Sequence, residues 1–403
     1  MGLVEDLAAD LGPDRVRPGG PDDAIGGLVP QAVAEPLSPA AVALVLARAG
    51  RDGLAVRVRG GGTKQAWSAP PARLDVVLST RALHRIVDHA PGDMTCVAEA
   101  GMPLAALQAA ISDVTTHRQR LMLDPPGGAG ATLGGVLATA AAGPRRVRYG
   151  TPRDLVIGAR YVTGDGLAAK TGGRVVKNVA GYDVAKLLIG SHGSLAVITE
   201  VALKLHPLPD AARTVVLREP DPDRAAAFCD AVRGAPITPA LVEAAWPEGL
   251  VLVRVESTAE GAAAQVERLR DLGPIEELDE PAADALAADL AVRAWAGPGP
   301  VLAVGVVPDR LPGLLRAAAA AGATLVVRAP VCAGELGLPD DDPERAARVV
   351  GAVRALGGSV QLRRGGEALR ALVHDEPGPA VRRLEAALKD GLDPHGVLAG
   401  AAR

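Results

Sequence analysis

Aromatic side chains are scarce in this sequence. Phe, Trp and Tyr together make up 2% of its 403 residues, and the formal net charge at pH 7 is -4. Proteins that bind nucleic acids usually combine a basic surface with aromatic platforms on which bases stack. The composition provides neither feature, so we expect no nucleic acid partner.

Cysteine is scarce as well. Cys96, Cys229 and Cys332 lie far apart and form neither a C-x-x-C pair nor an iron–sulfur spacing. We expect reduced thiols, and any electron relay through an iron–sulfur cluster would lie on another chain. No set of His, Asp and Glu residues has the spacing of metal ligands, so no metal site is indicated.

Targeting signals are also missing from the sequence. The opening residues, MGLVEDLAADLG, are acidic where a secretory signal peptide would be basic. No apolar run reaches the ~20 residues that a membrane-spanning helix needs. These two absences favour a cytoplasmic protein.

Glycine, in contrast, is abundant. It supplies 48 of the 403 residues, which is about 12% against a usual ~7%. Residues 124–154, DPPGGAGATLGGVLATAAAGPRRVRYGTPRD, contain almost no large side chain before the basic segment. We interpret them as a loop, a helix of small residues and a second loop, which lets the backbone approach a flat or anionic ligand. A tightly packed Ala/Gly helix in a core is an equally good interpretation of this stretch alone.

A second glycine cluster follows a predicted strand. Residues 54–59 alternate as LAVRVR and lead into Gly60-Gly61-Gly62-Thr63-Lys64. Backbone N–H groups in such a loop can surround phosphate oxygens, although the spacing is not that of a Walker P-loop. A plain glycine turn is the alternative. The spacing of Gly128, Gly130 and Gly134 misses the Rossmann fingerprint by one residue, so an NAD site of that kind is not expected.

The rest of the chain predicts an α+β protein. A helix should begin at Ser38-Pro39, since Ser is a good N-cap and Pro suits the first helical turn. We place a domain boundary near residue 210, which gives a lead-in over 1–29, one domain over 30–210 and an α+β domain over 211–403. In the last domain, predicted strands (214–218, 250–256, 301–307, 324–328, 359–363) alternate with helices (223–232, 259–272, 283–295, 310–321, 344–356). This alternation favours a sheet with helices on one face.

Four separated elements together resemble one family, the FAD-binding flavoproteins of the vanillyl-alcohol oxidase and p-cresol methylhydroxylase type. They are RGGGT at 59–63, the glycine-rich run at 126–154, KNVAGYD at 177–183 and GSHGSLAVITEVALKLHP at 190–207. The resemblance covers residues 30–210 and implies a two-subdomain FAD-binding domain followed by a small α+β domain with a helix-covered antiparallel sheet. Within this family, the third and fourth elements look most like the FAD-binding small subunit of bacterial glycolate oxidase.

The resemblance also implies FAD-contacting residues. Arg59 to Thr63 match the loop that holds the FAD diphosphate, and Thr63 stands where many relatives carry the His of a covalent flavin bond, so the FAD should be non-covalent. The full predicted cofactor site is Arg59, Gly60, Gly61, Gly62, Thr63, Pro126, Gly127, Thr132, Gly134, Gly135, Ala138, Thr139, Tyr149, Gly150, Asp154, Gly193 and Ile198.

The implied function is that of an FAD-binding subunit of a glycolate oxidase complex, which oxidises glycolate to glyoxylate. Its implied partners are a larger FAD-binding catalytic subunit and an iron–sulfur subunit, through which a cytoplasmic chain could be held at the inner membrane. Lys177 and Tyr182 are the candidate catalytic residues, with fixing of the loop and capping of the next helix as their alternative roles. Two other functions stay open. One is a non-catalytic flavin-binding or scaffolding subunit, since the histidine-rich motif of larger relatives is missing, and the other is a stand-alone FAD-dependent alcohol oxidase.

Overall fold

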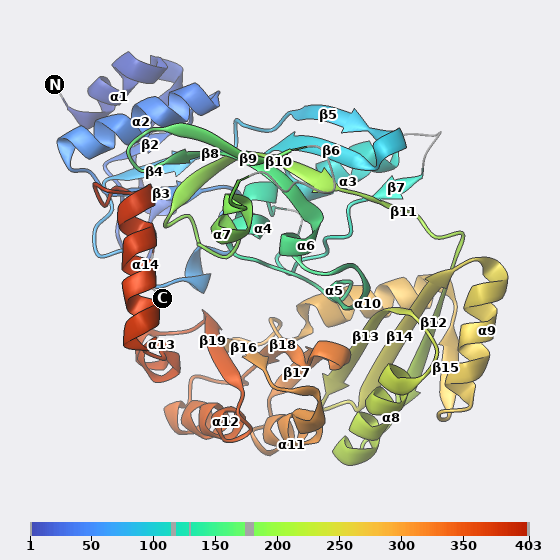
Figure 1. Cartoon of the computed structure of the whole chain (residues 1–403). Coiled ribbons are helices and arrows are strands. Elements are labelled where there is room, and N and C mark those ends of the chain that lie inside the picture. Colours follow the sequence, from blue (N-terminus) through green and yellow to red (C-terminus); the bar gives the residue numbers. More distant parts are fainter. Residues whose placement is uncertain (1, 114–117, 129, 174–180, 401–403) are drawn as a thin grey trace. The chain divides into compact units, whose positions relative to one another are not determined.

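The computed structural model describes residues 2–113, 118–128, 130–173 and 181–400. The chain forms two compact units, and it passes between them several times (Figure 1). The first unit comprises Met1–Ala142, Thr151–Leu208 and Glu376–Arg403, and the second comprises Gly143–Gly150 and Pro209–Asp375. No helix in the described ranges is long and apolar enough to cross a membrane.

The first unit begins with a small sheet covered by helices. Its strand order is β1-β2-β4-β3, in which β2, β4 and β3 run parallel and β1 is antiparallel. The predicted helix start is confirmed, since the Ser38 side chain accepts a hydrogen bond from the Ala41 N–H group and Pro39 opens α2. Buried Leu7, Val42 and Leu46 from α1 and α2 pack on this sheet. The elements are α1 (Leu3–Leu11), β1 (Val16–Pro18), β2 (Ala32–Ala34), α2 (Pro39–Asp52), β3 (Val56–Arg59) and β4 (Val76–Ser79).

A five-stranded antiparallel sheet completes the FAD-binding region predicted over 30–210. Its order is β5-β6-β10-β8-β9, and the long strands β8 and β10 lie at its centre. Short helices connect these strands, and β7 pairs with β11 beside them. The elements are β5 (Ile86–Ala90), β6 (Thr95–Glu99), α3 (Leu104–Ser112), β7 (Gln119–Arg120), α4 (Leu133–Ala138), α6 (Pro152–Leu155), β8 (Val156–Thr163), β9 (Ala168–Gly172), α7 (Val184–Leu188), β10 (Ala196–Lys204) and β11 (His206–Pro207).

The C-terminal segment belongs to the first unit, whereas the sequence limits assigned it to the domain over 211–403. After α14 (Pro379–Leu392), the N–H group of Val56 donates to the Val397 carbonyl and the N–H group of Ala399 donates to the Val56 carbonyl, each at 2.8 Å. The buried carboxylate of Asp393 holds this return, since it accepts hydrogen bonds from the N–H groups of Val397 and Leu398 at 2.9 and 2.8 Å. The two backbone hydrogen bonds of Val56 add the returning segment to the edge of the sheet beside β3.

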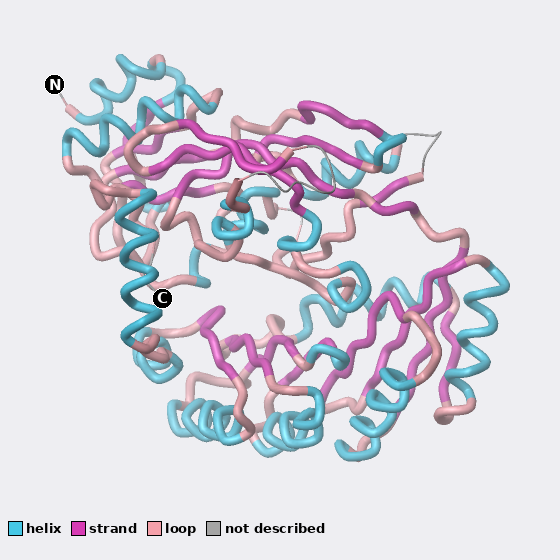
Figure 2. Tube along the Cα trace, in the orientation of Figure 1, coloured by secondary structure: helices cyan, strands magenta, loops and turns pink. Residues whose placement is uncertain are grey.

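The second unit contains an eight-stranded antiparallel sheet of order β15-β12-β14-β13-β17-β18-β16-β19. Figure 2 shows its strands in magenta with helices in cyan packed beside them. The predicted helix-covered antiparallel sheet is therefore confirmed. Helices cover both faces of this sheet, whereas the sequence predicted helices on one face. Helix α10 packs on the opposite face from α8, α9, α11 and α12. The strands are β12 (Ala211–Arg218), β13 (Pro239–Trp246), β14 (Leu250–Ser257), β15 (Ile275–Leu278), β16 (Val301–Gly305), β17 (Thr324–Arg328), β18 (Ala333–Gly337) and β19 (Ser359–Arg364). The helices are α5 (Arg146–Tyr149), α8 (Pro222–Gly234), α9 (Ala259–Arg270), α10 (Glu280–Arg293), α11 (Leu311–Ala320), α12 (Pro343–Ala355) and α13 (Glu367–Val373).

Candidate functional site

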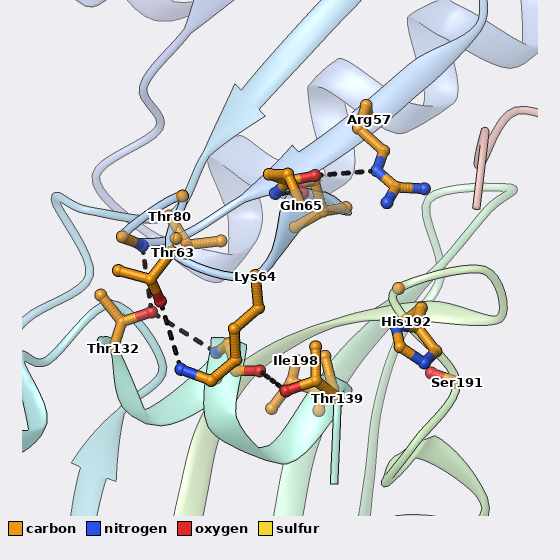
Figure 3. Close-up of a pocket in the computed structure, with 18 of the residues that line it drawn as sticks. Arg57, Thr63, Lys64, Gln65, Thr80, Thr132, Thr139, Ser191, His192 and Ile198 are labelled. Atoms are coloured by element: carbon orange, nitrogen blue, oxygen red, sulfur yellow. Dashed lines mark hydrogen bonds between the residues drawn. The ribbon is translucent and has the colours of Figure 1, made fainter. Parts of the chain in front are cut away.

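A pocket opens in the first unit where β3 ends (Figure 3). It encloses about 710 Å³ of space, counting the part open to solvent. Three segments supply most of its wall: the loop after β3, the start and body of α4, and the turn before β10. The lining residues are Arg57, Val58, Gly60, Gly61, Gly62, Thr63, Lys64, Gln65, Thr80, Thr132, Gly134, Gly135, Ala138, Thr139, Ser191, His192, Gly193, Ala196 and Ile198.

The two glycine clusters of the sequence lie directly against each other. A Cβ atom on Gly61 would stand 1.7 Å from the Gly130 carbonyl oxygen, and one on Gly60 would stand 2.1 Å from the Thr132 Oγ1 atom. Thr132 joins the clusters by hydrogen bonds, because its Oγ1 atom accepts from the N–H groups of Gly61 at 3.3 Å and Gly135 at 3.4 Å. The first of these bonds links the loop to the residue that caps α4. Glycine is required here by the close approach of two backbones.

The loop after β3 carries N–H groups that could hold an anion. No described residue accepts a hydrogen bond from the N–H groups of Gly60, Gly62, Thr63 or Lys64. Gly62 lies in the left-handed region with a φ of 78°, a conformation that costs glycine little. Successive unpaired N–H groups of this kind form a concave binding surface for phosphate oxygens.

The turn between α7 and β10 closes another side of the pocket. The N–H group of Gly190 donates to the Leu137 carbonyl at 3.0 Å, and the N–H group of His192 donates to the Ala138 carbonyl at 2.7 Å. His192 is held in the left-handed region with a φ of 54°. These bonds satisfy carbonyls at the end of α4, and they bring Ser191, His192 and Gly193 to the pocket wall.

Comparison with known proteins assigns a ligand class to this arrangement. Residues 30–172, which include both glycine clusters, match the family described as FAD binding domain. This segment of the chain is therefore similar to FAD-binding domains, and it supplies both glycine clusters of the pocket. The unpaired N–H groups and the absence of Cβ atoms in the loop after β3 fit the diphosphate of FAD.

Individual relatives support the same fold. The chain is 42% identical over 136 residues to the glycolate oxidase subunit GlcE of Escherichia coli. The aligned residues cover 34% of this chain and 38% of that protein. It is 36% identical over 176 residues to a D-lactate dehydrogenase of Archaeoglobus fulgidus, which is 43% of this chain and 38% of that protein. The chain therefore spans less than half the length of these two relatives. A structure of p-cresol methylhydroxylase with substrate bound superposes with a TM-score of 0.74 at 17% identity, covering 98% of this chain and 95% of that one.

Most of the predicted FAD-contacting residues come together in this pocket of the first unit. Arg59 does not line it, because β3 turns its guanidinium toward Asp23, whose Oδ1 atom lies 2.8 Å from Arg59 Nη2. Arg17 donates to the same carboxylate at 2.7 and 2.8 Å, and the bonds from the two arginines hold the pKa of Asp23 well below its usual range. The predicted residues that line the pocket are Gly60, Gly61, Gly62, Thr63, Thr132, Gly134, Gly135, Ala138, Thr139, Gly193 and Ile198.

The other predicted cofactor residues lie outside the lining. Gly127 is adjacent, since a Cβ atom there would stand 2.7 Å from the Lys64 Nζ atom, and Pro126 is buried beside it. Asp154 caps α6 by accepting hydrogen bonds from the Thr151 N–H group at 2.8 Å and hydroxyl at 2.9 Å. Gly150 and Tyr149 belong to the second unit.

Tyr149 takes part in a buried charge cluster of the second unit. Its hydroxyl donates to the Glu256 Oε2 atom at 3.0 Å, and Arg145 Nη1 donates to both carboxylate oxygens at 2.8 and 3.0 Å. Desolvation raises the pKa of Glu256, but the charge of Arg145 and its hydrogen bonds outweigh it and hold that pKa below the ordinary value. Sequence spacing could not predict this pairing, because Arg145 and Glu256 are more than a hundred residues apart.

Of the two predicted catalytic residues, the structure describes Tyr182, which does not line this pocket. The side chain of Tyr182 is 94% exposed, and its carbonyl accepts a hydrogen bond from the Thr171 hydroxyl at 3.0 Å. Lys177 lies outside the described residues. Their catalytic role stays a prediction.

The predicted cofactor site omitted several residues that line the pocket, of which Lys64 and Arg57 carry charge. Arg57 is 4% exposed and donates to the Gln65 Oε1 atom at 3.0 Å and to the Ala399 carbonyl at 2.9 Å. Lys64 is 7% exposed. The alternation of residues 54–59 did place Arg57 on one face of β3, but the same pattern gave equal weight to Arg59. Only the pairing of Arg59 with Asp23 distinguishes them.

Proposed function

We propose that this chain is an FAD-linked oxidoreductase subunit that acts on the CH–OH group of a 2-hydroxy acid, with glycolate as the substrate and glyoxylate as the product. The observation that carries the proposal is the glycine-lined pocket, with its unpaired loop N–H groups, in the segment that matches an FAD-binding domain. The names of two relatives, a glycolate oxidase subunit and a D-lactate dehydrogenase, support a hydroxy acid as the substrate class.

The cofactor and the chain's own residues would supply different parts of this chemistry. FAD, when bound, supplies the acceptor for the hydride of the substrate's α-carbon. The loop after β3 and Thr132 would hold the diphosphate, and the small residues of α4 leave room for the rest of the cofactor. A base for the substrate hydroxyl and a cation for its carboxylate are also needed. Lys177 and Tyr182 are proposed for these tasks.

A non-catalytic flavin-binding or scaffolding subunit is the second candidate function. It is favoured by the surroundings of the residues that could act as a base. Tyr182 is almost fully exposed, and His374 and His395, the only histidines after residue 206, are both exposed. In this case the chain would work beside a larger FAD-binding subunit and an iron–sulfur subunit, which are proposed partners. The E. coli relative is itself named a subunit.

An anaerobic visible spectrum of the FAD-loaded chain separates these functions. Addition of glycolate should bleach the oxidised flavin if the chain has its own dehydrogenase site, and acetate, which lacks the hydroxyl, serves as the control. A flavin spectrum that glycolate leaves unchanged would support the non-catalytic subunit. A chain that takes up no FAD would refute both candidates.

A further inference from the structure

The pocket contains a buried cation without an acidic partner. Lys64 is 7% exposed, and no acidic side chain lines the pocket or forms a salt bridge with Lys64 among the described residues. Its Nζ atom lies 3.2 Å from the Thr63 Oγ1 atom and 5.5 Å from the centre of the Trp67 ring. A charged ammonium that is removed from water without a counter-ion is strongly disfavoured. Lys64 therefore lies where an anionic ligand would stabilise it.

Arg57, the other cation that lines the pocket, is in a different situation. Its guanidinium donates to Gln65, to the Ser68 hydroxyl at 2.5 Å and to the Ala399 carbonyl, so neutral protein acceptors occupy its N–H groups. An ammonium group has three N–H donors, and Thr63 is the acceptor that the structure provides for Lys64. Lys64 thus has donors left for a ligand, while Arg57 is committed to the protein.

Lys64 lines the same pocket as the glycine loop that precedes it. Figure 3 shows the Lys64 side chain extending toward the Thr63 hydroxyl. Gly127 leaves room for the ammonium, because a Cβ atom at this position would stand 2.7 Å from Nζ. The ammonium and the loop residues Gly62 and Thr63, whose N–H groups have no acceptor among the described residues, therefore belong to the lining of one pocket.

We propose that Lys64 is the counter-ion of the FAD diphosphate and that this side chain, rather than Arg59, supplies the positive charge of the cofactor site. The inference rests on the FAD-binding domain and on no assumption about the substrate. It assigns the positive charge to a side chain, in addition to the backbone N–H groups of the loop.

This role has a pH signature. Burial lowers the pKa of Lys64 to about 8 in the absence of a ligand, and a bound diphosphate would raise it again. FAD affinity should therefore be constant below about pH 7 and should fall as pH rises through 8, because binding must then take up a proton. Arg57 and His192 are the other titratable groups that line the pocket. An arginine side chain stays protonated throughout this pH range.

The test uses the full-length chain freed of FAD, with calorimetric titration of FAD and of ADP-ribose, which contains the diphosphate but no flavin ring. Loss of one charge-assisted hydrogen bond corresponds to about a 10- to 100-fold weaker affinity. K64M should weaken both ligands by such a factor at pH 7 and should raise the melting temperature of the FAD-free chain. K64R should retain most of the affinity and lose the alkaline fall, whereas K170M, at an exposed position on β9, should match the wild type in every respect.

Three results would overturn the inference. The first is that K64M binds ADP-ribose as tightly as the wild type does. The second is that K64M loses affinity for FAD alone, which would place the ammonium at the flavin ring. The third is that the FAD affinity of the wild type does not fall as pH rises through 8. If K64M does not fold, the pH profile of K64R against wild type still decides. Failure of glycolate to bleach the flavin, with the Lys64 effects intact, would count against the proposed catalysis only.

Discussion

The contact between the two glycine clusters makes Gly61→Ala an informative perturbation. A Cβ atom on Gly61 would lie 1.7 Å from the Gly130 carbonyl oxygen and 2.9 Å from its carbon, and both are backbone atoms that no rotamer change can move. Real Cβ atoms keep at least 3.0 Å from such neighbours, so the loops must separate by about 1.3 Å, and overpacking of this kind destabilises a folded protein. Gly61 does not have a positive φ, so the penalty is purely steric.

The expected cost is about 1–3 kcal/mol, the range measured for overpacked sites. It should appear mainly as lost FAD affinity, because separation of the loops would move the N–H groups that are proposed to hold the diphosphate and would break the Gly61–Thr132 hydrogen bond. A cost of this size corresponds to a ~5- to 150-fold rise in the dissociation constant of FAD, as each 1.4 kcal/mol is a tenfold change. The assay is a titration that follows the quenching of flavin fluorescence, with thermal unfolding measured in parallel.

Gly92→Ala is the matched control. Gly92 lies in the same unit, has no positive φ, and a Cβ atom added there would meet no other atom within 4 Å. The substitution should therefore leave both FAD affinity and melting temperature unchanged. If Gly61→Ala bound FAD as tightly as Gly92→Ala does, the argument that the clusters build the cofactor site by close backbone approach would be refuted.

Three further outcomes are expected. Arg59→Gln should lower the free energy of unfolding by about 1–2 kcal/mol through loss of a charged hydrogen bond to Asp23, but it should change FAD affinity little. Urea unfolding and FAD titration of the same variant measure the two effects. A large loss of FAD affinity would show that Arg59 belongs to the cofactor site. Glu256→Gln should destabilise the chain by about 2–4 kcal/mol because Arg145 loses its buried counter-charge. Since the folded-state pKa of Glu256 is lowered, its contribution should be complete above about pH 5 and should decline as pH falls below 4, so unfolding curves of wild type and variant should converge in acid. Tyr182→Phe should leave the melting temperature unchanged, because the side chain is 94% exposed; an unchanged glycolate-dependent rate would rule out its proposed catalytic role.

Local sequence signals determined much of the fold. Ser38 and Pro39 specify the start of α2 wherever that helix packs, because the cap and the first turn satisfy each other within four residues. Alternation specified β3, and the predicted strands over 250–256, 324–328 and 359–363 correspond to β14, β17 and β19. Strand β13 was missed for a physical reason. Its sequence, PALVEAAW, is buried on both faces and so shows no period of two.

The cofactor site divides in the same way between sequence and structure. The glycine clusters were predictable, because glycine is the residue type that allows two backbones to approach closely. Which cation faces the pocket was not predictable. Arg57, Arg59 and Lys64 are neighbours in the chain, and the choice among them depends on Asp23 and on the returning C-terminal segment, which only the folded chain brings to β3. Backbone requirements are therefore visible in the sequence itself, whereas the partners of charged side chains depend on contacts between distant segments and are decided by the tertiary structure.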